Sequence, residues 1–315
     1  MCAVQEVRDP APAVSWQTSL EGFMLAKRAS GLRERTLADY KYFITTFFRS
    51  FPNAWHDPAS LKQACLEWLG QRGMASQTFN KKLTYLRVFL RWCQDERILK
   101  TNPVAGFKVK RTSPRIVDIS EDVLKRLLAL PDRKTFTGRR DYALLLLTLD
   151  TGIRPGEAFK LTLSDINFQA AEVYVRGEVS KTGIRRTLPV SPVTLRAIRD
   201  LIAARHPSWG EEVPLFCSEN ARPLDKDSWG ARLHVYSQQL GCKVKPYDLR
   251  HVFALQFLRA GGNAFALQRL LGHSDMSMTQ AYVALTQGDL KTQHTLASPL
   301  NALVSTKPRA PRRVK

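Results

Sequence analysis

The chain has 315 residues, 44% of them hydrophobic, which is enough for two domains of ordinary size with well-filled cores. Lys and Arg number 48 against 28 Asp and Glu, and the net charge of +20 predicts a polyanionic partner, nucleic acid before an anionic membrane surface. The five cysteines form no CxxC pair and the six histidines lack metal-ligand spacing, so we expect no disulfide framework, metal or cofactor. Without a leader pattern or an apolar run of roughly 20 residues, the chain is expected to be cytoplasmic and nucleoid-associated, with no membrane span.

Residues 1–14 are rich in Pro and Ala, and we expect them to be flexible. From 15 to 105 apolar residues recur at spacings of three and four, which predicts a helical domain. Ser60 and Ser76 are predicted helix N-caps, and Gly73 a helix stop. Solvated faces are the ordinary reading of basic helix residues, but in so basic a chain we expect these to contact DNA phosphates. They are Lys81, Lys82, Arg87 and Arg91.

The helical pattern breaks at residues 101–115, which contain prolines, a glycine and several basic residues. We expect 106–115 to be an extended basic linker that crosses the DNA backbone between two DNA-binding domains. Lys108, Lys110 and Arg111 are its predicted phosphate contacts.

Residues 116–300 show a mixed pattern. A hairpin is predicted at 172–190, because Val173 and Val175 alternate with polar neighbours and "RRTLPV" follows a turn with Lys181 at its tip. Residues 301–315 read as a disordered basic tail. The predicted fold is therefore mostly α with a small antiparallel β-sheet. Helices are expected at 120–130, 140–150, 156–161, 191–205, 225–240, 248–260, 264–271 and 277–286, with Ser120 and Ser191 as N-caps.

Four short patterns in this region could carry chemistry, and each has an ordinary structural reading. In "TGIRPGE", Arg154 opens a helix, where backbone amides favour an anion, although a lone arginine there is usually surface charge. Lys181 on a hairpin tip is most simply solvated. In "KPYDLRHVFALQ", Asp248 is expected to secure a helix start, with Tyr247 and Arg250 on one face. In "LLGHSDMSMTQAYVAL", a turn histidine and a core tyrosine would suffice for His273 and Tyr282.

Taken in order, these motifs resemble the tyrosine recombinase (phage integrase) family. The resemblance covers a catalytic domain at about 116–300, and "FNKKLTYLRVFLRWCQDERILKTNPV" resembles the family's core-binding domain. It implies a site-specific DNA recombinase that cleaves and rejoins DNA through a 3′-phosphotyrosyl intermediate without metal or ATP. The implied roles are catalytic arginines for Arg154 and Arg250, the hairpin lysine for Lys181, the histidine for His273, the nucleophile for Tyr282, and an orienting acid for Glu157.

The chemistry of phosphoryl transfer agrees with these roles. Two arginines can stabilise the charge that develops on the non-bridging phosphate oxygens. A tyrosine ester conserves the energy of the broken bond. Lys181 can protonate the leaving 5′-oxygen, and His273 can donate to a phosphate oxygen.

The chain departs from the family pattern at one position. The family's "HxLRH" box usually begins with a histidine that helps to deprotonate the nucleophile, and here Tyr247 stands in that place. Phenols ionise near pH 10 and are poor bases, so we expect Tyr247 to donate a hydrogen bond to phosphate and Tyr247→Phe to cost on the order of 1–2 kcal/mol in cleavage. His251, one residue after Arg250, is a second candidate whose place on the next turn is less favourable.

The expected partner is double-stranded DNA with inverted-repeat-like core sites. The resemblance implies a homotetramer in the synaptic complex, a monomer or weak oligomer when free, and leaves accessory DNA-bending proteins open. A mobile-element role is one reading among integrase, resolvase and transposon functions. The alternatives are DNA relaxation of the type IB topoisomerase kind and a catalytically decayed DNA-binding relative.

Overall fold

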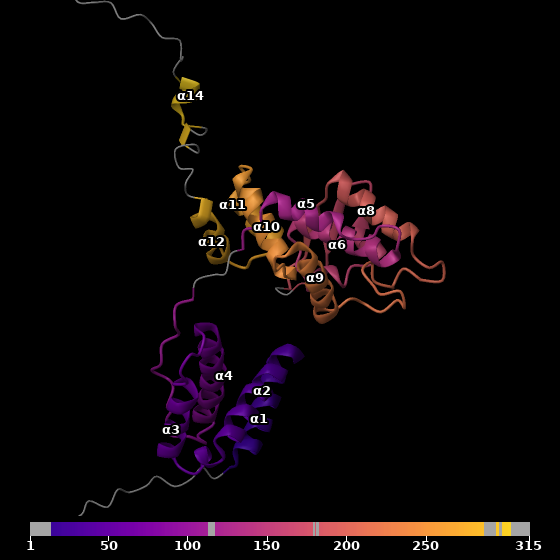
Figure 1. The fold of residues 1–315 in the computed structure, drawn as a ribbon. Coiled ribbons are helices and arrows are strands. Elements are labelled where there is room, and N and C mark those ends of the chain that lie inside the picture. The colour runs from indigo at the N-terminus through magenta and orange to yellow at the C-terminus, as the bar shows by residue number, and fades with distance from the viewer. Residues whose placement is uncertain are drawn as a thin grey trace, which may run out of the picture. The chain divides into compact units, whose positions relative to one another are not determined.

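The computed structural model describes residues 14–112, 117–178, 180, 183–286, 294–295 and 298–303. The chain divides into two compact units, Met1–Ser113 and Pro114–Lys315. The protein is mostly helical with a small antiparallel sheet, which confirms the predicted fold class (Figure 1). Within the described residues, none of the helices is long and apolar enough to cross a membrane.

The first unit is a helical domain with an aromatic core. Phe23, Phe47 and Phe89 are fully buried, and the ring of Phe23 meets that of Phe89 edge-on at 5.5 Å. Such aromatic pairs stabilise a small helical core beyond simple area burial. The elements are α1 (Trp16–Ala29), α2 (Glu34–Ser50), the 3-10 turn η1 (Pro52–Trp55), α3 (Pro58–Leu69) and α4 (Ser76–Asp95).

Helix α3 begins and ends earlier than the sequence predicts. The prediction of Ser60 as its N-cap is wrong, because Asp57 holds that position and accepts from two backbone N–H groups, including that of Ser60, at 2.9 Å. An Asp that precedes the first helical turn satisfies amides that otherwise lack a partner. Helix α3 stops at the C-cap Gly70, before Gly73, and Ser76 is the first residue of α4 rather than its cap.

The residues that follow α4 are bound to it, although the sequence predicts an extended connector there. Asn80 and Lys110 exchange two hydrogen bonds of 2.8 Å, and Asn102 donates to the carbonyl of Arg87. The Arg87 guanidinium in turn donates to the carbonyl of Val104, a fully buried residue. Residues 102–110 are therefore part of the first unit. A sequence rich in Pro, Gly and Lys gives no sign of these side-chain-to-backbone bonds.

The second unit combines helices with a three-stranded sheet of order β1-β2-β3. Val173 on β2 pairs with Ile166 on β1 and with Leu188 on β3, both antiparallel. The hairpin β2–β3 was predicted and β1 was not. The elements are α5 (Glu121–Ala129), α6 (Phe136–Thr151), α7 (Pro155–Ala158), η2 (Leu163–Asp165), β1 (Ile166–Asn167), β2 (Glu172–Val175), β3 (Arg186–Pro189), α8 (Pro192–Ala203), α9 (Lys226–Leu240), α10 (Pro246–Arg259), α11 (Ala264–Leu271), α12 (Ser277–Thr286) and α14 (Leu300–Leu303).

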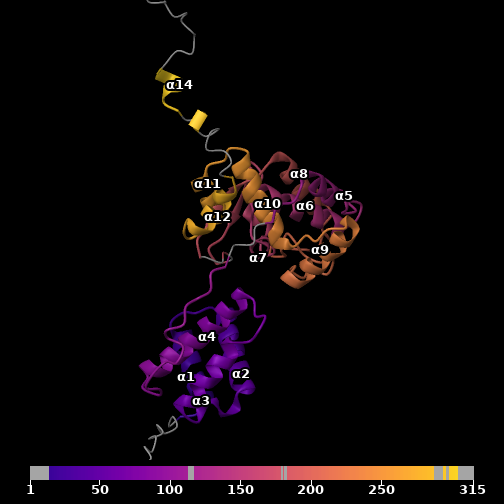
Figure 2. The same cartoon turned by 60° about the vertical axis from the view of Figure 1, so that its left-hand side comes forward.

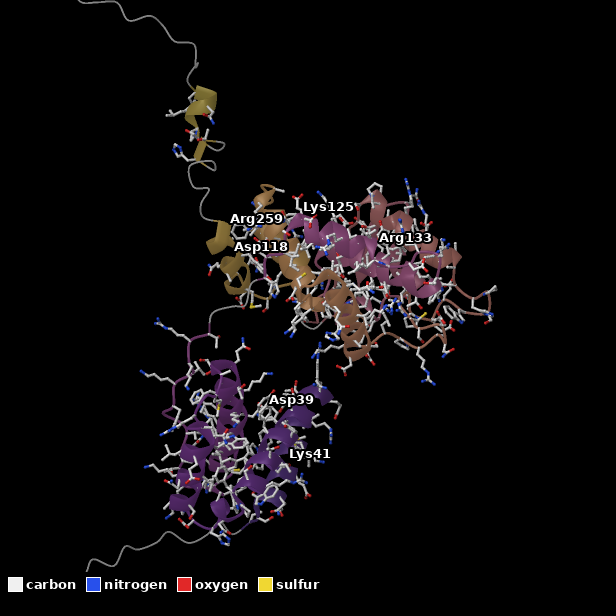
Figure 3. All side chains as sticks on the ribbon, in the orientation of Figure 1. Asp39, Lys41, Asp118, Lys125, Arg133 and Arg259 are labelled. Atoms are coloured by element: carbon white, nitrogen blue, oxygen red, sulfur yellow. The ribbon has the colours of Figure 1, made fainter. Side chains whose placement is uncertain are left out.

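Helix α6 forms the centre of this unit and helix α10 joins it to the C-terminal helices. Leu144, Leu145 and Leu147 of α6 are fully buried, and α6 packs against both α8 and α10. Helix α10 lies between α6 on one side and α11 and α12 on the other (Figure 2). At its end, Arg259 donates to both carboxylate oxygens of Asp118, at 3.1 and 2.6 Å (Figure 3).

Most predicted helices are found with shifted ends. The predictions for α11 and α12 match their observed bounds, and Ser191 caps α8 with Pro192 as its first helical residue. Helix α6 starts at Phe136 instead of 140, because Thr135 accepts from the backbone N–H of Gly138 and caps it there. The predicted helix at 156–161 is the single turn α7, and α10 begins two residues earlier than predicted.

Candidate active site

Arg154 lies at a tight turn between α6 and α7. Gly152 ends α6 in the left-handed conformation (φ 63°), and a Cβ at this position would overlap the ring of Phe253. Glu157, the third residue of α7, accepts from the backbone N–H of Arg154 at 3.2 Å and from its Nη1 at 3.0 Å. The Glu157 carboxylate thus closes the first turn of α7 and orients the guanidinium of Arg154. Glu157 is the residue that the sequence predicts as an orienting acid.

A second arginine, Arg186 on β3, binds the same carboxylate. Its Nη2 and Nη1 donate to Glu157 at 2.6 and 3.3 Å, and both side chains are buried. Burial alone would raise the pKa of Glu157, but the hydrogen bonds and charges of Arg186 and Arg154 outweigh it and hold this pKa below its usual value. Arg186 was not among the site residues predicted from the sequence. Its place in "RRTLPV", directly after the predicted lysine tip, was the available signal.

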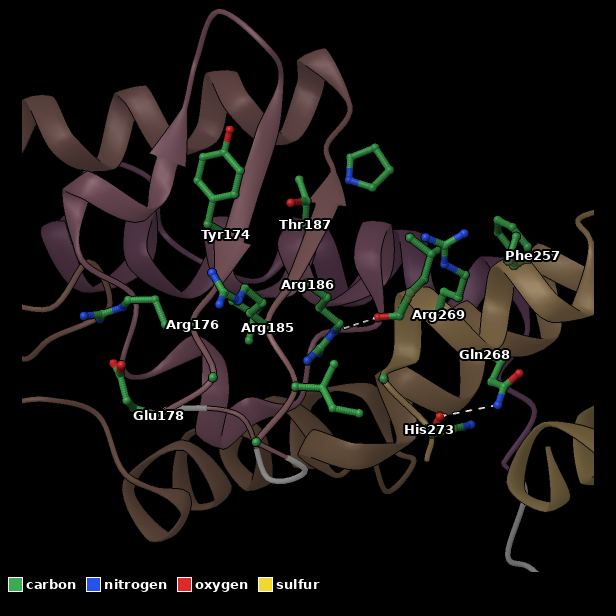
Figure 4. A pocket seen from close by; sticks show the side chains of 18 residues that line it. Tyr174, Arg176, Glu178, Arg185, Arg186, Thr187, Phe257, Gln268, Arg269 and His273 are labelled. Carbon is green, nitrogen blue, oxygen red and sulfur yellow. Dashed lines mark hydrogen bonds between the residues drawn. The ribbon is translucent and has the colours of Figure 1, made fainter. Parts of the chain in front are cut away.

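Three arginines form hydrogen bonds with the C-terminal end of α11. The last carbonyls of a helix lack intrahelical partners and carry partial negative charge, so they attract guanidinium groups. Three successive carbonyls here each accept from a different arginine, and Figure 4 shows the first of these bonds. The bonds are Arg186 Nε to Leu270 O (2.9 Å), Arg250 Nη2 to Leu271 O (2.8 Å) and Arg154 Nη2 to Gly272 O (3.0 Å).

Arg250 is the most buried of these arginines, with 3% of its surface exposed. Besides α11, its Nη1 donates to the carbonyl of Gly152 at 2.6 Å, so it joins α10 to the end of α6. Burial, and then the charge of Arg154, lower the pKa of Arg250 to about 9, which leaves it charged at pH 7. Asp248 secures the start of α10 as predicted, accepting from the backbone N–H of Lys245 at 3.0 Å.

His273 follows α11 and contacts Arg250. Its Nε2 lies 3.1 Å from Arg250 Nη2, and its Nδ1 lies 3.0 Å from the hydroxyl of buried Thr279. Arginine has no acceptor atom, so Nε2 must accept and the proton of the neutral ring must be on Nδ1. Burial, and then the charges of Arg250 and Arg154, lower the pKa of His273 to about 4. The free protein thus holds a neutral His273 that has no Nε2 proton for a phosphate oxygen.

We expect a bound phosphate to raise the pKa of His273, because the negative charge of the phosphate offsets the positive charge of the arginines. The ring then takes up a proton. In the free protein the ring should stay neutral down to about pH 4, and in the presence of a DNA site its titration should move upward by NMR of labelled histidines. His273→Gln assigns the signal. Because the unfolded chain protonates this histidine near pH 6.5 and the folded chain only near 4, His273 should lower the free energy of unfolding as the pH falls between these values. An imidazolium signal at pH 7 in the free protein would contradict this assignment.

Tyr282 is a buried tyrosine on α12. It is 4% exposed and packs with Phe253, Leu267 and Leu271 in a small apolar cluster. Its hydroxyl lies 2.7 Å from Nδ1 of His251 on α10. Burial raises the pKa of Tyr282 above its ordinary value, and the charge of Arg250 opposes the rise. The contact brings the predicted nucleophile to the helix that carries Arg250.

One predicted site residue of the described part of the chain, Tyr247, is not hydrogen-bonded to this group. Tyr247 is 47% exposed in the first turn of α10 and forms no hydrogen bond within the described part of the chain. The structure brings His251, which the sequence ranked second, to the tyrosine hydroxyl instead. Lys181 lies outside the described residues.

A cavity of ≈ 1350 Å³ adjoins the site between the β2–β3 hairpin and α10 and α11. Arg186 and His273 line it, whereas Arg154, Arg250 and Tyr282 do not (Figure 4). Three more arginines on its walls, Arg176, Arg185 and Arg269, outnumber the one lining carboxylate, Glu178, so the net charge of the cavity is positive. A groove of net positive charge concentrates anionic ligands.

The predicted DNA contacts of the first unit fall into two groups. Some are engaged within the protein: Lys82 Nζ lies 3.7 Å from the centre of the Trp68 ring, and Lys110 Nζ lies 4.3 Å from that of Phe79. Arg87 donates to backbone carbonyls after α4, which favours a structural role for it. The other members of the set, Lys81, Arg91, Lys108 and Arg111, are exposed, as is Lys110.

Comparison with known proteins gives the class of this protein. Residues 118–288 match the model of the Phage integrase family, so the chain belongs to this family of tyrosine recombinases. Membership implies DNA cleavage and rejoining. The chain is 31% identical over 231 residues to tyrosine recombinase XerC of Thermodesulfovibrio yellowstonii, which covers 70% of this chain and 74% of that protein. It is 28% identical to tyrosine recombinase XerA of Pyrococcus furiosus, over 90% of this chain and 96% of the relative.

Solved structures show the same fold. The Tn1549 transposon integrase in complex with transposon right end DNA aligns with a TM-score of 0.69 at 17% identity, covering 87% of this chain and 98% of the other. A lambda integrase dimer bound to a core site aligns at 0.66 with 19% identity, over 84% and 97% of the two chains.

Proposed function

We propose that this protein recombines DNA at specific sites by cleaving and rejoining strands through a 3′-phosphotyrosyl intermediate on Tyr282. The main support for the proposal is that two neighbouring residues of α10 contact both parts of the candidate site. Arg250 joins the arginines at the end of α11, and the next residue, His251, lies 2.7 Å from the hydroxyl of Tyr282. These contacts join the proposed nucleophile to the helix that carries one of the proposed phosphate donors.

The arginines supply the positive charge that phosphoryl transfer needs. Each guanidinium has five N–H donors, and among the described residues Arg154 donates two hydrogen bonds and Arg250 donates three. The remaining donors are available to non-bridging phosphate oxygens, which gain charge in the transition state. Glu157 and the carbonyls of α11 hold both groups in place beforehand, so little reorganisation is needed. In this proposal Lys181 protonates the leaving 5′-oxygen.

The proposed partner is a pair of double-stranded DNA sites with inverted-repeat-like cores, held by four copies of the chain. The exposed basic residues of the first unit would contact phosphates, and Arg176, Arg185 and Arg269 would do so beside the active site. Such contacts fix the register of the protein on DNA and make its affinity depend on salt.

A paired assay tests this function against DNA relaxation. Purified protein is given a plasmid with two copies of a site selected from a genomic DNA pool, and a supercoiled plasmid with none. We expect recombinant products from the first and no relaxation of the second. Relaxation without recombination would point to topoisomerase activity, and binding without cleavage in both assays to a decayed relative.

For the biological role we propose integration or excision of a mobile element. The support is the likeness in fold to a transposon integrase, while the sequence relatives carry Xer names. Sequencing of the genomic fragments that the protein binds and cleaves tests it. Sites at both ends of a movable segment are expected, and a single site without such a segment would overturn the role but not the chemistry.

A further inference from the structure

His251 is positioned for a role that the motif resemblance gives to another residue. It lies on α10, one turn after Tyr247, and its Nδ1 is 2.7 Å from Oη of Tyr282. The two rings are tilted at 44° with centroids 5.8 Å apart, so the nitrogen meets the hydroxyl edge-on rather than through stacking. Tyr247, the residue in the family's histidine position, is 47% exposed.

The surroundings of Tyr282 call for a local proton acceptor. Its side chain is almost fully buried among apolar residues of α10 and α11, so bulk water has little access to it. A phenol that attacks phosphorus must lose its proton in the same step, and a base must lie within hydrogen-bond distance to take it. Among the described groups of the site, the arginines carry positive charge, Glu157 is bonded to two of them, and both ring nitrogens of His273 are engaged by Arg250 and Thr279.

We propose that His251 is the general base that activates Tyr282. As Oη of Tyr282 forms its bond to phosphorus, its proton passes to Nδ1 of His251, while the bond from phosphorus to O5′ breaks. The departing O5′ takes a proton from the general acid proposed above. In the rejoining step the 5′-hydroxyl returns its proton to that acid as O5′ attacks phosphorus, the bond from phosphorus to Oη breaks, and His251 returns its proton to Oη. The phosphate group changes only its ester partner, and no oxidant or reductant takes part.

The inference rests on the proposed function, and it explains how the chain works without a histidine at position 247. Neutral imidazole accepts protons near neutral pH, which makes it a far better base than a phenol. The helix places His251 next to Arg250 in sequence, so a single element carries both the base for the nucleophile and a donor for the phosphate.

Single-turnover cleavage of a nicked suicide substrate by the full chain tests the inference. His251→Asn places an amide near the position of Nδ1 but cannot take a proton, and we expect cleavage about 10²-fold slower. The matched variant Tyr247→Phe, on the same helix face, should lose only about 5- to 30-fold. Thermal unfolding and DNA binding of both variants show that the fold and the complex are retained.

A substrate with sulfur in place of the bridging 5′-oxygen separates the base from the general acid. A thiolate leaves without a proton, so this substrate should restore cleavage by Lys181→Ala but not by His251→Asn. Restoration of His251→Asn would assign His251 to the leaving group and overturn the inference. Faster cleavage by His251→Asn would show that the contact restrains Tyr282, and would overturn it too.

The same experiment keeps the inference apart from the proposed function. If the unaltered chain forms no covalent adduct, the proposed function fails. If it forms the adduct and His251→Asn does so at an equal rate, only the role of His251 fails.

Discussion

Replacing Arg250 with lysine should slow DNA cleavage by about 10²–10³-fold, the loss expected when a preorganised transition-state donor is removed. The guanidinium joins Gly152, Leu271 and His273 at once, and a lysine ammonium cannot reproduce this planar set of donors. The rate of covalent adduct formation on a suicide substrate at saturating protein measures the loss.

The same helix provides a matched control. Arg259→Lys changes an exposed arginine at the end of α10, whose partner is Asp118, and cleavage should stay within about threefold of the unaltered chain. Equal rates for Arg250→Lys and the unaltered chain would remove Arg250 from the catalytic group.

Replacing Glu157 with alanine should destabilise the second unit by about 3–5 kcal/mol, because it leaves the largely buried Arg154 and Arg186 without their shared carboxylate. Urea denaturation measures the change, with Glu121→Ala as the control. Glu121 pairs with Lys125 on the exposed face of α5, and its loss should change the free energy of unfolding by less than about 1 kcal/mol.

The pH dependence of this effect has a definite sign. The pKa of Glu157 is lower in the folded protein than its ordinary value of 4.5, so its stabilising effect is present above pH 4.5. That effect is lost as the pH falls through the folded pKa. The difference in stability between the unaltered chain and Glu157→Gln should therefore shrink below pH 4.5. A constant difference down to pH 3 would show that Glu157 does not carry the charge of this cluster.

The helices of the second unit were predictable because their apolar spacing and caps are local. Helices α11 and α12 match the sequence because Gly272 and the polar turn after it separate two apolar stretches. Strand β1 has two residues, too few for an alternating pattern, and exists only through its pairing with β2. Helix α3 was misplaced because Asp57 and Ser60 are both good caps, and only one can open the helix.

Most residues of the candidate site could be predicted from the order of the motifs, but the partners that these residues contact could not. Arg186 binds the carboxylate of Glu157, which lies 29 positions earlier in the chain, and donates to the carbonyl of Leu270, which lies 84 positions after Arg186. No local pattern encodes such contacts. His251 was underrated for a related reason, since helical spacing from Arg250 says nothing about where α12 places the hydroxyl of Tyr282.

The identity of the residue that bonds covalently to DNA tests the central claim most directly. The full chain is trapped on a suicide substrate made from a selected site, the complex is digested, and mass spectrometry locates the nucleotide-bearing peptide. We predict a phosphate ester on Tyr282, and no adduct with Tyr282→Phe although DNA binding persists. A nucleotide on any other residue, or an adduct formed by Tyr282→Phe, would contradict the account.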